Sequence, residues 1–264
     1  MNRSTDRSTD PSDYQHVPRP VAAMPKPFKD GATIAPHRHR RAQLIYAATG
    51  VMRVTTAAGA FVVPPRRALW VPPGEEHALR MQGEVAMRTL YIEPKAARAM
   101  PRSCVVIEVS SLLRALVDAA MEEPVLYDPR GRGGMIMRLL LGELKAAPRL
   151  KLSIPMPEDR RLQRLCGSLL SHPQSDATLE HWAEHVGASA RNLERLFRRE
   201  TGMSFGAWRQ QARLVEALAQ LASGAPVGQV ARRLGYRSAS AFTQMFRRAL
   251  GRTPRDYVAR APRA

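Results

Sequence analysis

An internal repeat in the last hundred residues constrains the fold of this chain more than any other feature. From the serine that ends each turn onward, the two copies match at a constant spacing of 49 residues without a gap, as in Phe197-Arg198-Arg199 and Phe246-Arg247-Arg248. The one change in length lies in the preceding turn, where Gly187-Ala188-Ser189 corresponds to Gly235-Tyr236-Arg237-Ser238. An ordered match of this kind indicates two copies of one folding unit rather than a bias in composition.

Each copy has the pattern of a helix-turn-helix. In the first copy, Thr178 can cap a short helix that ends at Gly187, and Ser189 can cap a second helix over 190–200. The second copy repeats this pattern with helices expected over 228–234 and 239–249. Residues 206–223 lie between the copies and predict a connecting helix of about 25 Å.

The second helix of each copy has the chemistry of a helix that enters the DNA major groove, because its outward positions hold arginines and small polar side chains. We expect those early in each helix to read base edges and the late arginines to contact phosphates. The predicted DNA-binding residues are Arg191, Asn192, Glu194, Arg195 and Arg198 in the first helix and Ala239, Ser240, Thr243, Gln244 and Arg247 in the second.

The net charge of +18 is concentrated in the same region. Residues 160–264 contain 18 arginines, no lysine and seven acidic residues. Dense arginine on a small domain suits the neutralisation of phosphates in double-stranded DNA. A GC-rich genome would favour arginine as well, so the charge alone leaves the partner open.

The first half of the chain predicts a different architecture. Between about residues 32 and 94, short apolar runs are broken by glycine and proline, a texture that favours a β-barrel or sandwich. Residues 111–122 and 132–146 have helical periodicity. We therefore expect an α+β protein, divided into a flexible arm (1–25), a barrel (26–110), a helical extension (111–147), a proline-containing linker (148–158) and an all-α double helix-turn-helix domain (159–264).

Two motifs in the barrel region resemble those of cupins. Gly31-x5-His37-x-His39-x3-Gln43-x6-Gly50 is similar to the first cupin motif, and Pro72-x-Gly74-x2-His77 to the second. The resemblance implies that His37, His39 and His77 meet inside the barrel, the first two from one strand face. They would hold Zn, Ni, Fe or Mn, with Gln43 as a weaker fourth ligand where many cupins have Glu. Alternatively, the histidines bind a small molecule or line the cavity without a metal.

Residues 160–258 resemble the DNA-binding domain of AraC/XylS-type transcription regulators. The likeness rests on Leu196-Phe197-Arg198-Arg199 with Gly202, on Gly235-Tyr236, and on the closing Gly251-x2-Pro254-x2-Tyr257. Glu194 departs from the family, which often has an uncharged or basic residue there; an acidic side chain would favour cytosine. The N-terminal half looks like regulators of drug-efflux transporters related to the nitroimidazole-resistance repressor, which implies an effector-controlled regulator of a neighbouring efflux gene.

The remaining features narrow the class of protein. Two cysteines, Cys104 and Cys166, cannot build a disulfide framework, and no apolar signal or membrane span is present, so we expect a cytoplasmic protein without a membrane partner. No catalytic motif stands out; the alternative to a regulator is a metal-dependent cupin oxygenase or isomerase fused to a DNA-binding domain. The two predicted helices have apolar faces formed by Leu112, Leu113, Leu116, Ile136, Leu139 and Leu140, which either form a dimer interface or pack on the barrel; we expect a homodimer.

Overall fold

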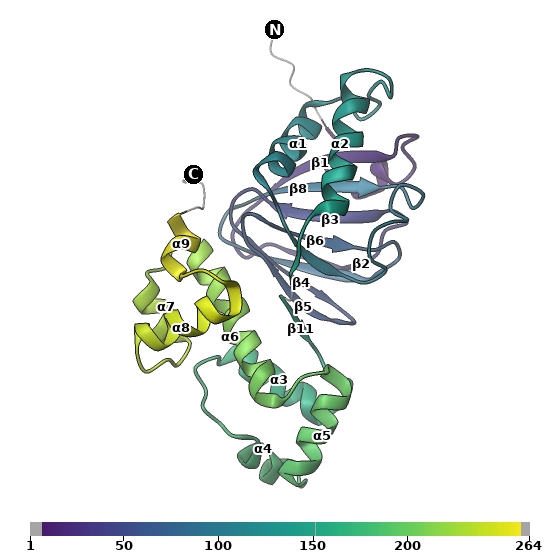
Figure 1. The fold of residues 1–264 in the computed structure, drawn as a ribbon. Helices are drawn as coiled ribbons and strands as arrows, with labels where there is room; N and C mark the ends of the chain where they lie inside the picture. The colour runs from purple at the N-terminus through teal and green to yellow at the C-terminus, as the bar shows by residue number, and fades with distance from the viewer. Residues whose placement is uncertain (1–6, 151, 260–264) are drawn as a thin grey trace. The chain divides into compact units, whose positions relative to one another are not determined.

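The computed structural model describes residues 7–150 and 152–259. Contacts between Cα atoms divide the chain into two compact units, one formed by residues 1–56 and 63–151 and the other by residues 57–62 and 152–264. Strands dominate the first unit and helices the second, as Figure 1 shows. The chain is an α+β protein with a sheet-rich N-terminal part and a helical C-terminal part, which confirms the predicted fold class.

The strands of the first unit pair antiparallel in two layers. One sheet has the order β1 (Val21–Phe28), β8 (Val85–Ile92), β3 (Ala42–Ala47), β6 (Arg67–Val71), β9 (Val105–Glu108) and β10 (Arg149–Leu150). In the other, β7 (His77–Gln82) pairs with β4 (Val51–Thr56) on one side and with β2 (Thr33–His37) on the other. The turn-rich, alternating sequence of this half therefore forms the cupin-like architecture that it predicts.

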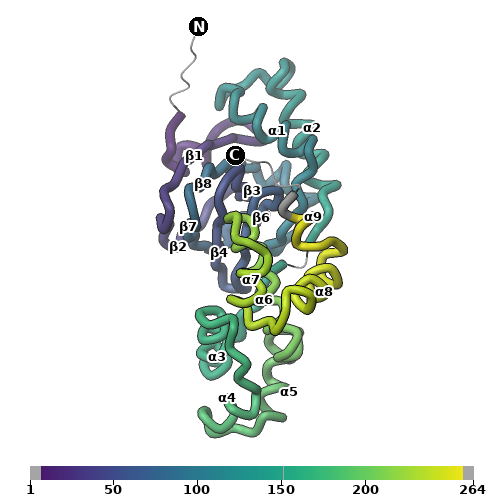
Figure 2. The backbone as a smooth tube through the Cα atoms, turned by 90° about the vertical axis from the view of Figure 1, so that its left-hand side faces the viewer, coloured from purple at the N-terminus to yellow at the C-terminus, as the bar shows by residue number. Residues whose placement is uncertain are grey.

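Two helices, α1 (Ser111–Glu122) and α2 (Arg132–Ala146), lie side by side and cover one face of the first sheet (Figure 2). Their buried residues join a hydrophobic cluster with alternate residues of the strands, such as Leu44, Tyr46 and Trp70. Full burial of one such side chain stabilises the fold by about 1.5–3 kcal/mol. Because side chains alternate across a strand, Gln43 points to the opposite face of β3 from Leu44.

The N-terminal stretch corrects the prediction of a flexible arm over residues 1–25. Pro11–Tyr14 form a short 3-10 helix, and β1 follows within the predicted arm. Tyr14 is buried, with its ring 5.8 Å from that of Tyr91 on β8. The packed part of the first unit therefore begins well before residue 26, while residues 1–6 of the predicted arm lie outside the described residues.

The predicted linker, residues 148–158, also contains ordered structure on both sides of residue 151, which is not described. β10 pairs with β9, and β11 (Ser153–Pro155) pairs with β5 (Gly59–Val63). The Trp208 indole N–H donates to Pro155 O at 2.7 Å, which attaches β11 to the helices. The boundary between the two units thus falls inside the predicted linker, at residues 151 and 152.

The second unit consists mainly of helices that follow the repeat. Ser189 and Ser238 cap the second helix of each copy through their hydroxyl groups, and Gly202 and Gly251, both with φ near +70°, end these helices. The helices are α3 (Arg160–Ser171), α4 (Leu179–His185), α5 (Ala190–Thr201), α6 (Phe205–Ala222), α7 (Val227–Arg233), α8 (Ala239–Leu250) and α9 (Pro254–Ala259). The long helix α6 connects the two copies, as expected (Figure 1).

Candidate functional site

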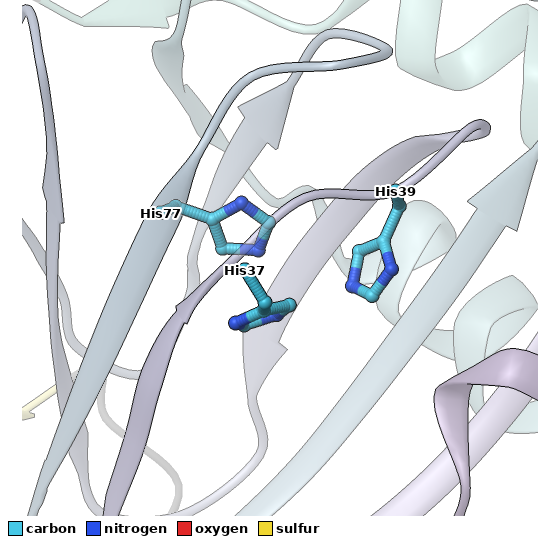
Figure 3. Close-up of side chains that lie close together, drawn as sticks. All are labelled: His37, His39 and His77. Atoms are coloured by element: carbon cyan, nitrogen blue, oxygen red, sulfur yellow. The ribbon is translucent and has the colours of Figure 1, made fainter.

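Three histidines converge in the first unit (Figure 3). His37 ends β2 and faces His77, the first residue of β7, in the antiparallel pairing. The strand pairing ends there, so His39 lies in the connection to β3 and not on the strand as predicted; its carbonyl accepts the Gly74 N–H at 2.8 Å. The His37 ring centroid is 4.4 Å from that of His77 and 4.8 Å from that of His39, and one nitrogen of each ring lies within 4.8 Å of the others.

Hydrogen bonds fix two of the rings so that one nitrogen remains available. His37 Nδ1 lies 2.8 Å from Ala35 O, and His77 Nδ1 lies 3.0 Å from Glu75 O. A carbonyl only accepts, so in the neutral form of each ring Nδ1 carries the proton and Nε2 keeps a lone pair. His39 Nε2 and His77 Nε2 are buried without a hydrogen-bond partner among the described residues. This is the arrangement found at metal sites, where a backbone carbonyl orients the ligating imidazole.

The surroundings favour the neutral form of the His39 and His77 imidazoles. Burial, followed by the neighbouring His37 and His77, lowers the pKa of His39 to about 4. Burial also lowers the pKa of His77, which outweighs the raising effect of its hydrogen bond to Glu75. Both rings are therefore uncharged at neutral pH, the form that binds a divalent metal.

Gln43, the second residue of β3, is linked to this cluster through a tyrosine. Its Nε2 donates to Thr89 Oγ1 at 2.9 Å and, at 3.5 Å, to the hydroxyl oxygen of Tyr91, and its Oε1 is buried without a partner among the described residues. The Tyr91 ring in turn lies 5.0 Å from the His39 ring, edge to face. The structure thus brings the three histidines together and joins Gln43 to them through Tyr91.

The two helix-turn-helix units present the expected recognition helices. On α5, Leu193 and Phe197 are buried, while on α8 the buried residues are Phe242, Met245 and Phe246. Most of the predicted DNA-binding residues lie on the opposite, exposed sides of these helices: Arg191, Asn192, Arg195, Arg198, Ala239, Ser240, Gln244 and Arg247. Glu194 and Thr243 are half-buried.

A groove runs beside each recognition helix, and the repeat relates the two grooves. The first, of about 440 Å³, is lined by residues that include Ala190, Arg191, Glu194 and Phe205. The second, of about 610 Å³, is lined by the equivalent residues of the second copy among others: Ala239, Ser240, Thr243 and Pro254. The same surface feature therefore occurs twice in this unit.

Comparison with known proteins agrees with both halves of this description. Residues 29–140 match the AraC-like ligand binding domain, and residues 182–260 match a helix-turn-helix domain. The HTH-type transcriptional regulator NimR of Escherichia coli (strain K12) is 35% identical over 231 residues, which cover 88% of this chain and 84% of that protein. The chain belongs to the AraC family of transcription regulators.

Other members of the AraC family match as well. The arabinose operon regulatory protein of Escherichia coli (strain K12) is 25% identical over 219 residues, covering 75% of this chain and 74% of that protein. Among solved structures, the DNA-binding domain of AdpA in complex with a target DNA is 32% identical, covers 38% of this chain and 92% of that one, and has a TM-score of 0.36. No helix within the described ranges has the length and apolar character needed to cross a membrane.

In this AraC-family chain, Glu194 has a structural task that the sequence did not reveal. Its Oε1 accepts from Arg198 Nε at 2.8 Å, and its Oε2 accepts the Phe205 backbone N–H at 3.2 Å, at the start of α6. A carboxylate at a helix N-terminus satisfies an N–H that lacks a partner within the helix. Each carboxylate oxygen therefore already accepts one hydrogen bond within the protein.

Sequence reasoning also missed Thr89 and Tyr91, which hold the Gln43 amide. Both lie on β8, where the hydroxyls stand two residues apart and therefore on one face of the strand. That spacing is the signal that could have found them. Their pairing with Gln43 depends on the strand order, since β3 lies beside β8 in the sheet.

Proposed function

We propose that the AraC-type regulator described here is controlled by a divalent metal ion at His37, His39 and His77, alone or together with a small-molecule effector. The supporting observation is the buried, unpartnered Nε2 atom of His39 and of His77 beside the third ring. A Zn, Ni, Fe or Mn(II) ion would supply a positive centre with open coordination positions for a small ligand.

The chain's own residues would orient this site. Ala35 O and Glu75 O hold the rings of His37 and His77, and Thr89 with Tyr91 holds the amide of Gln43. The free Gln43 Oε1 is an acceptor for a donor group on the effector or a weak metal ligand. Burial raises the pKa of Tyr91, so its hydroxyl stays protonated.

Metal content tests this proposal. We expect the purified protein to take up one Zn²⁺ or Ni²⁺ per chain by mass spectrometry and calorimetry, and the His37→Ala/His39→Ala variant to take up none at that site. The matched control is His181→Ala/His185→Ala, which removes two exposed histidines whose rings lie 4.3 Å apart. Equal metal loss in the two variants would mean that the binding is adventitious.

The regulatory role has a separate readout. The His37→Ala/His39→Ala variant is expected to keep its basal DNA affinity and lose the change in affinity that the metal or effector causes. Gln43→Ala should cause a smaller loss, because it acts beside the histidines. An unchanged response in the double variant would show that control lies elsewhere.

We also propose a target and a mode of action. The resemblance of the N-terminal half to regulators of drug-efflux transporters supports a neighbouring efflux transporter gene as the target, read as double-stranded DNA by both helix-turn-helix units. Sequencing DNA fragments recovered with the purified protein tests the target. We further propose that the chain binds its effector in the cytoplasm without converting it, which recovery of unchanged effector after long incubation tests.

A homodimer completes the proposal, although through fewer residues than the sequence predicts. Leu113, Leu116 and Leu140 lie in the core against the sheet, with Ile136 packed partly against it. The exposed apolar residues of the predicted faces are Leu112 and Leu139, and Met135 lies one turn before Leu139 on α2; these residues are 48–56% exposed. Leu139→Glu should shift the protein from dimer to monomer in sedimentation analysis while the monomer keeps its fold.

A further inference from the structure

Arg213 lies in the middle of α6, where it contacts elements of both helix-turn-helix copies. Its Nε donates to Pro173 O at 2.8 Å, and its Nη2 donates to Ser175 O at 2.9 Å. Both carbonyls belong to the loop that leads into α4. One turn earlier on α6, Arg209 donates to Ala177 O in the same loop at 3.3 Å.

The face of the same guanidinium group lies on the second copy. The Arg213 guanidinium carbon lies 5.7 Å from the centre of the Tyr236 ring, in the turn between α7 and α8. The Tyr236 ring rests edge-on against Phe242, which is fully buried at the base of α8. One side chain thus connects the loop before the first recognition unit to the turn of the second.

The backbones of these two segments also approach closely. Gly235 has a φ of +75°, and a Cβ there would lie 2.7 Å from Gln174 O. Only glycine allows this approach at this conformation without displacing the loop. The two copies therefore meet directly at Gly235 as well as through Arg213.

The repeat itself shows that this contact is a special feature of the second turn. The Tyr236 N–H bonds to Ala231 O as the Ala188 N–H bonds to Ala183 O, so Tyr236 takes the place of Ala188. The first turn has a methyl group where the second has an aromatic ring. The second copy therefore differs from the first at Tyr236, the residue whose ring contacts Arg213.

We propose that Arg213, Tyr236 and Gly235 form a joint that sets the distance and rotation between the two recognition helices, so that these residues determine the spacing between the two DNA half-sites. The inference rests on the proposed function, in which both units bind DNA. Each added base pair moves the second half-site by about 3.4 Å and turns it by about 35°, so a rigid joint tolerates few spacings. Arginine is required because its planar fork serves two carbonyls while its face lies on the ring.

A spacing experiment tests the joint. Duplexes carry the DNA site recovered with the protein, with the segment between the half-sites shortened or lengthened by one or two base pairs. Wild-type protein is expected to lose about ten-fold in affinity for each base pair. Arg213→Lys should reduce that loss to about two-fold while binding a single half-site as the wild type does.

Two further variants keep the result decisive. Tyr236→Leu preserves apolar contact with Phe242 and removes the ring face, so it should flatten the spacing profile in the same way even if Arg213→Lys folds poorly. Arg164→Ala, an exposed arginine on α3, is the control for lost charge and should keep the wild-type profile. Spacing profiles parallel to that of the wild type in both Arg213→Lys and Tyr236→Leu would overturn the proposed joint, and so would a wild-type protein whose affinity does not depend on spacing. Absence of any DNA binding would instead refute the proposed function.

Discussion

The first recognition helix, α5, exposes arginines where the second, α8, exposes small or neutral side chains. Arg191 and Arg195 on α5 correspond to Ser240 and Gln244 on α8. Arginine attracts phosphates over long range and pairs with guanine, whereas glutamine forms short-range bonds suited to adenine. The comparison teaches that one backbone unit, used twice, can present different chemistry: we expect the first copy to contribute more of the affinity, and the two copies to prefer different bases.

The two copies also differ in how the helix after the recognition helix begins. In the first copy, Glu194 accepts the Phe205 N–H, while the equivalent position in the second copy is Pro254, which has no N–H to satisfy. There, Thr253 and Asp256 form a capping box within α9 itself. A carboxylate on the recognition helix therefore has an N–H to accept in the first copy. At the equivalent Thr243 a carboxylate would find no such N–H, because Pro254 has none.

Support from outside the repeat is the third difference. Trp208 and Tyr257 are equivalent in the repeat, but Trp208 is fully buried and bonds to Pro155 in β11. Each ring also packs on the equivalent phenylalanine of its own copy, Trp208 at 5.9 Å from Phe197 and Tyr257 at 5.8 Å from Phe246. The first copy thus has a direct contact with β11 through Trp208.

Among the changes that test the difference between the two copies, removal of β11 should have the largest effect on stability. A fragment of residues 158–264 is expected to be about 3 kcal/mol less stable than one of residues 152–264, because it loses the buried Ile154 and leaves the Trp208 N–H unpaired. Hydrogen exchange should show the loss in α5 and the start of α6. Equal loss of protection in α8 would contradict the separate support of the two copies.

Arg195→Ala is expected to cost ~1–3 kcal/mol of binding at the preferred DNA site and to relax the choice of one or two bases. Gln244→Ala, its counterpart, should lower affinity less and relax a different pair of bases. Binding to a set of single-base variants of the recovered site measures both. If Arg195→Ala weakens all variants alike, α5 does not read bases through this residue.

Glu194→Ala should lower the stability of the second unit by about 1–2 kcal/mol, because the Phe205 N–H loses a charged acceptor. Thr243→Ala, at the equivalent position, should change it by a few tenths of a kcal/mol. Glu194→Gln keeps an acceptor and should recover part of the loss. Thermal melting gives these values, and an altered base preference in Glu194→Gln would restore the reading of Glu194 as a cytosine contact.

Local sequence signals were sufficient for the helices. Residues 111–122 and 132–146 form helices with the predicted bounds because their apolar periodicity and flanking residues agree, as where Ser110 caps α1. The recognition helices follow for the same reason. In contrast, β1 was hidden by Pro25 and Pro27, which it tolerates because it pairs on one side only, with β8.

Site residues were predictable where a short motif carries them and not where partners come from distant strands or helices. The cupin-like motifs were enough to predict that His37, His39 and His77 meet, although His39 lies beyond the end of β2 and not on one strand with His37. Helical periodicity put Glu194 on the outward side of α5 but contains no information on the start of α6, which lies eleven residues later. The leucines of α1 and α2 could not be divided between core and surface without the sheet they cover.

The smallest difference that we expect between the two copies is in how much the late arginine of each recognition helix contributes to the salt dependence of DNA binding. Arg247 is exposed near the end of α8, and Arg247→Ala should weaken all DNA sequences alike and reduce the slope of log K against log[salt] by about one. Arg198 holds the same position on α5, but Glu194 lies 2.8 Å from its Nε and already compensates part of its charge. Arg198→Ala should therefore reduce the slope by less than Arg247→Ala does, measured on one duplex at two or more salt concentrations. Glu194→Gln removes that compensation, so in the Glu194→Gln background Arg198→Ala should change the slope by nearly the full value of about one. If Arg198→Ala in the wild-type background changes the slope as much as Arg247→Ala does, the ion pair opens when DNA binds.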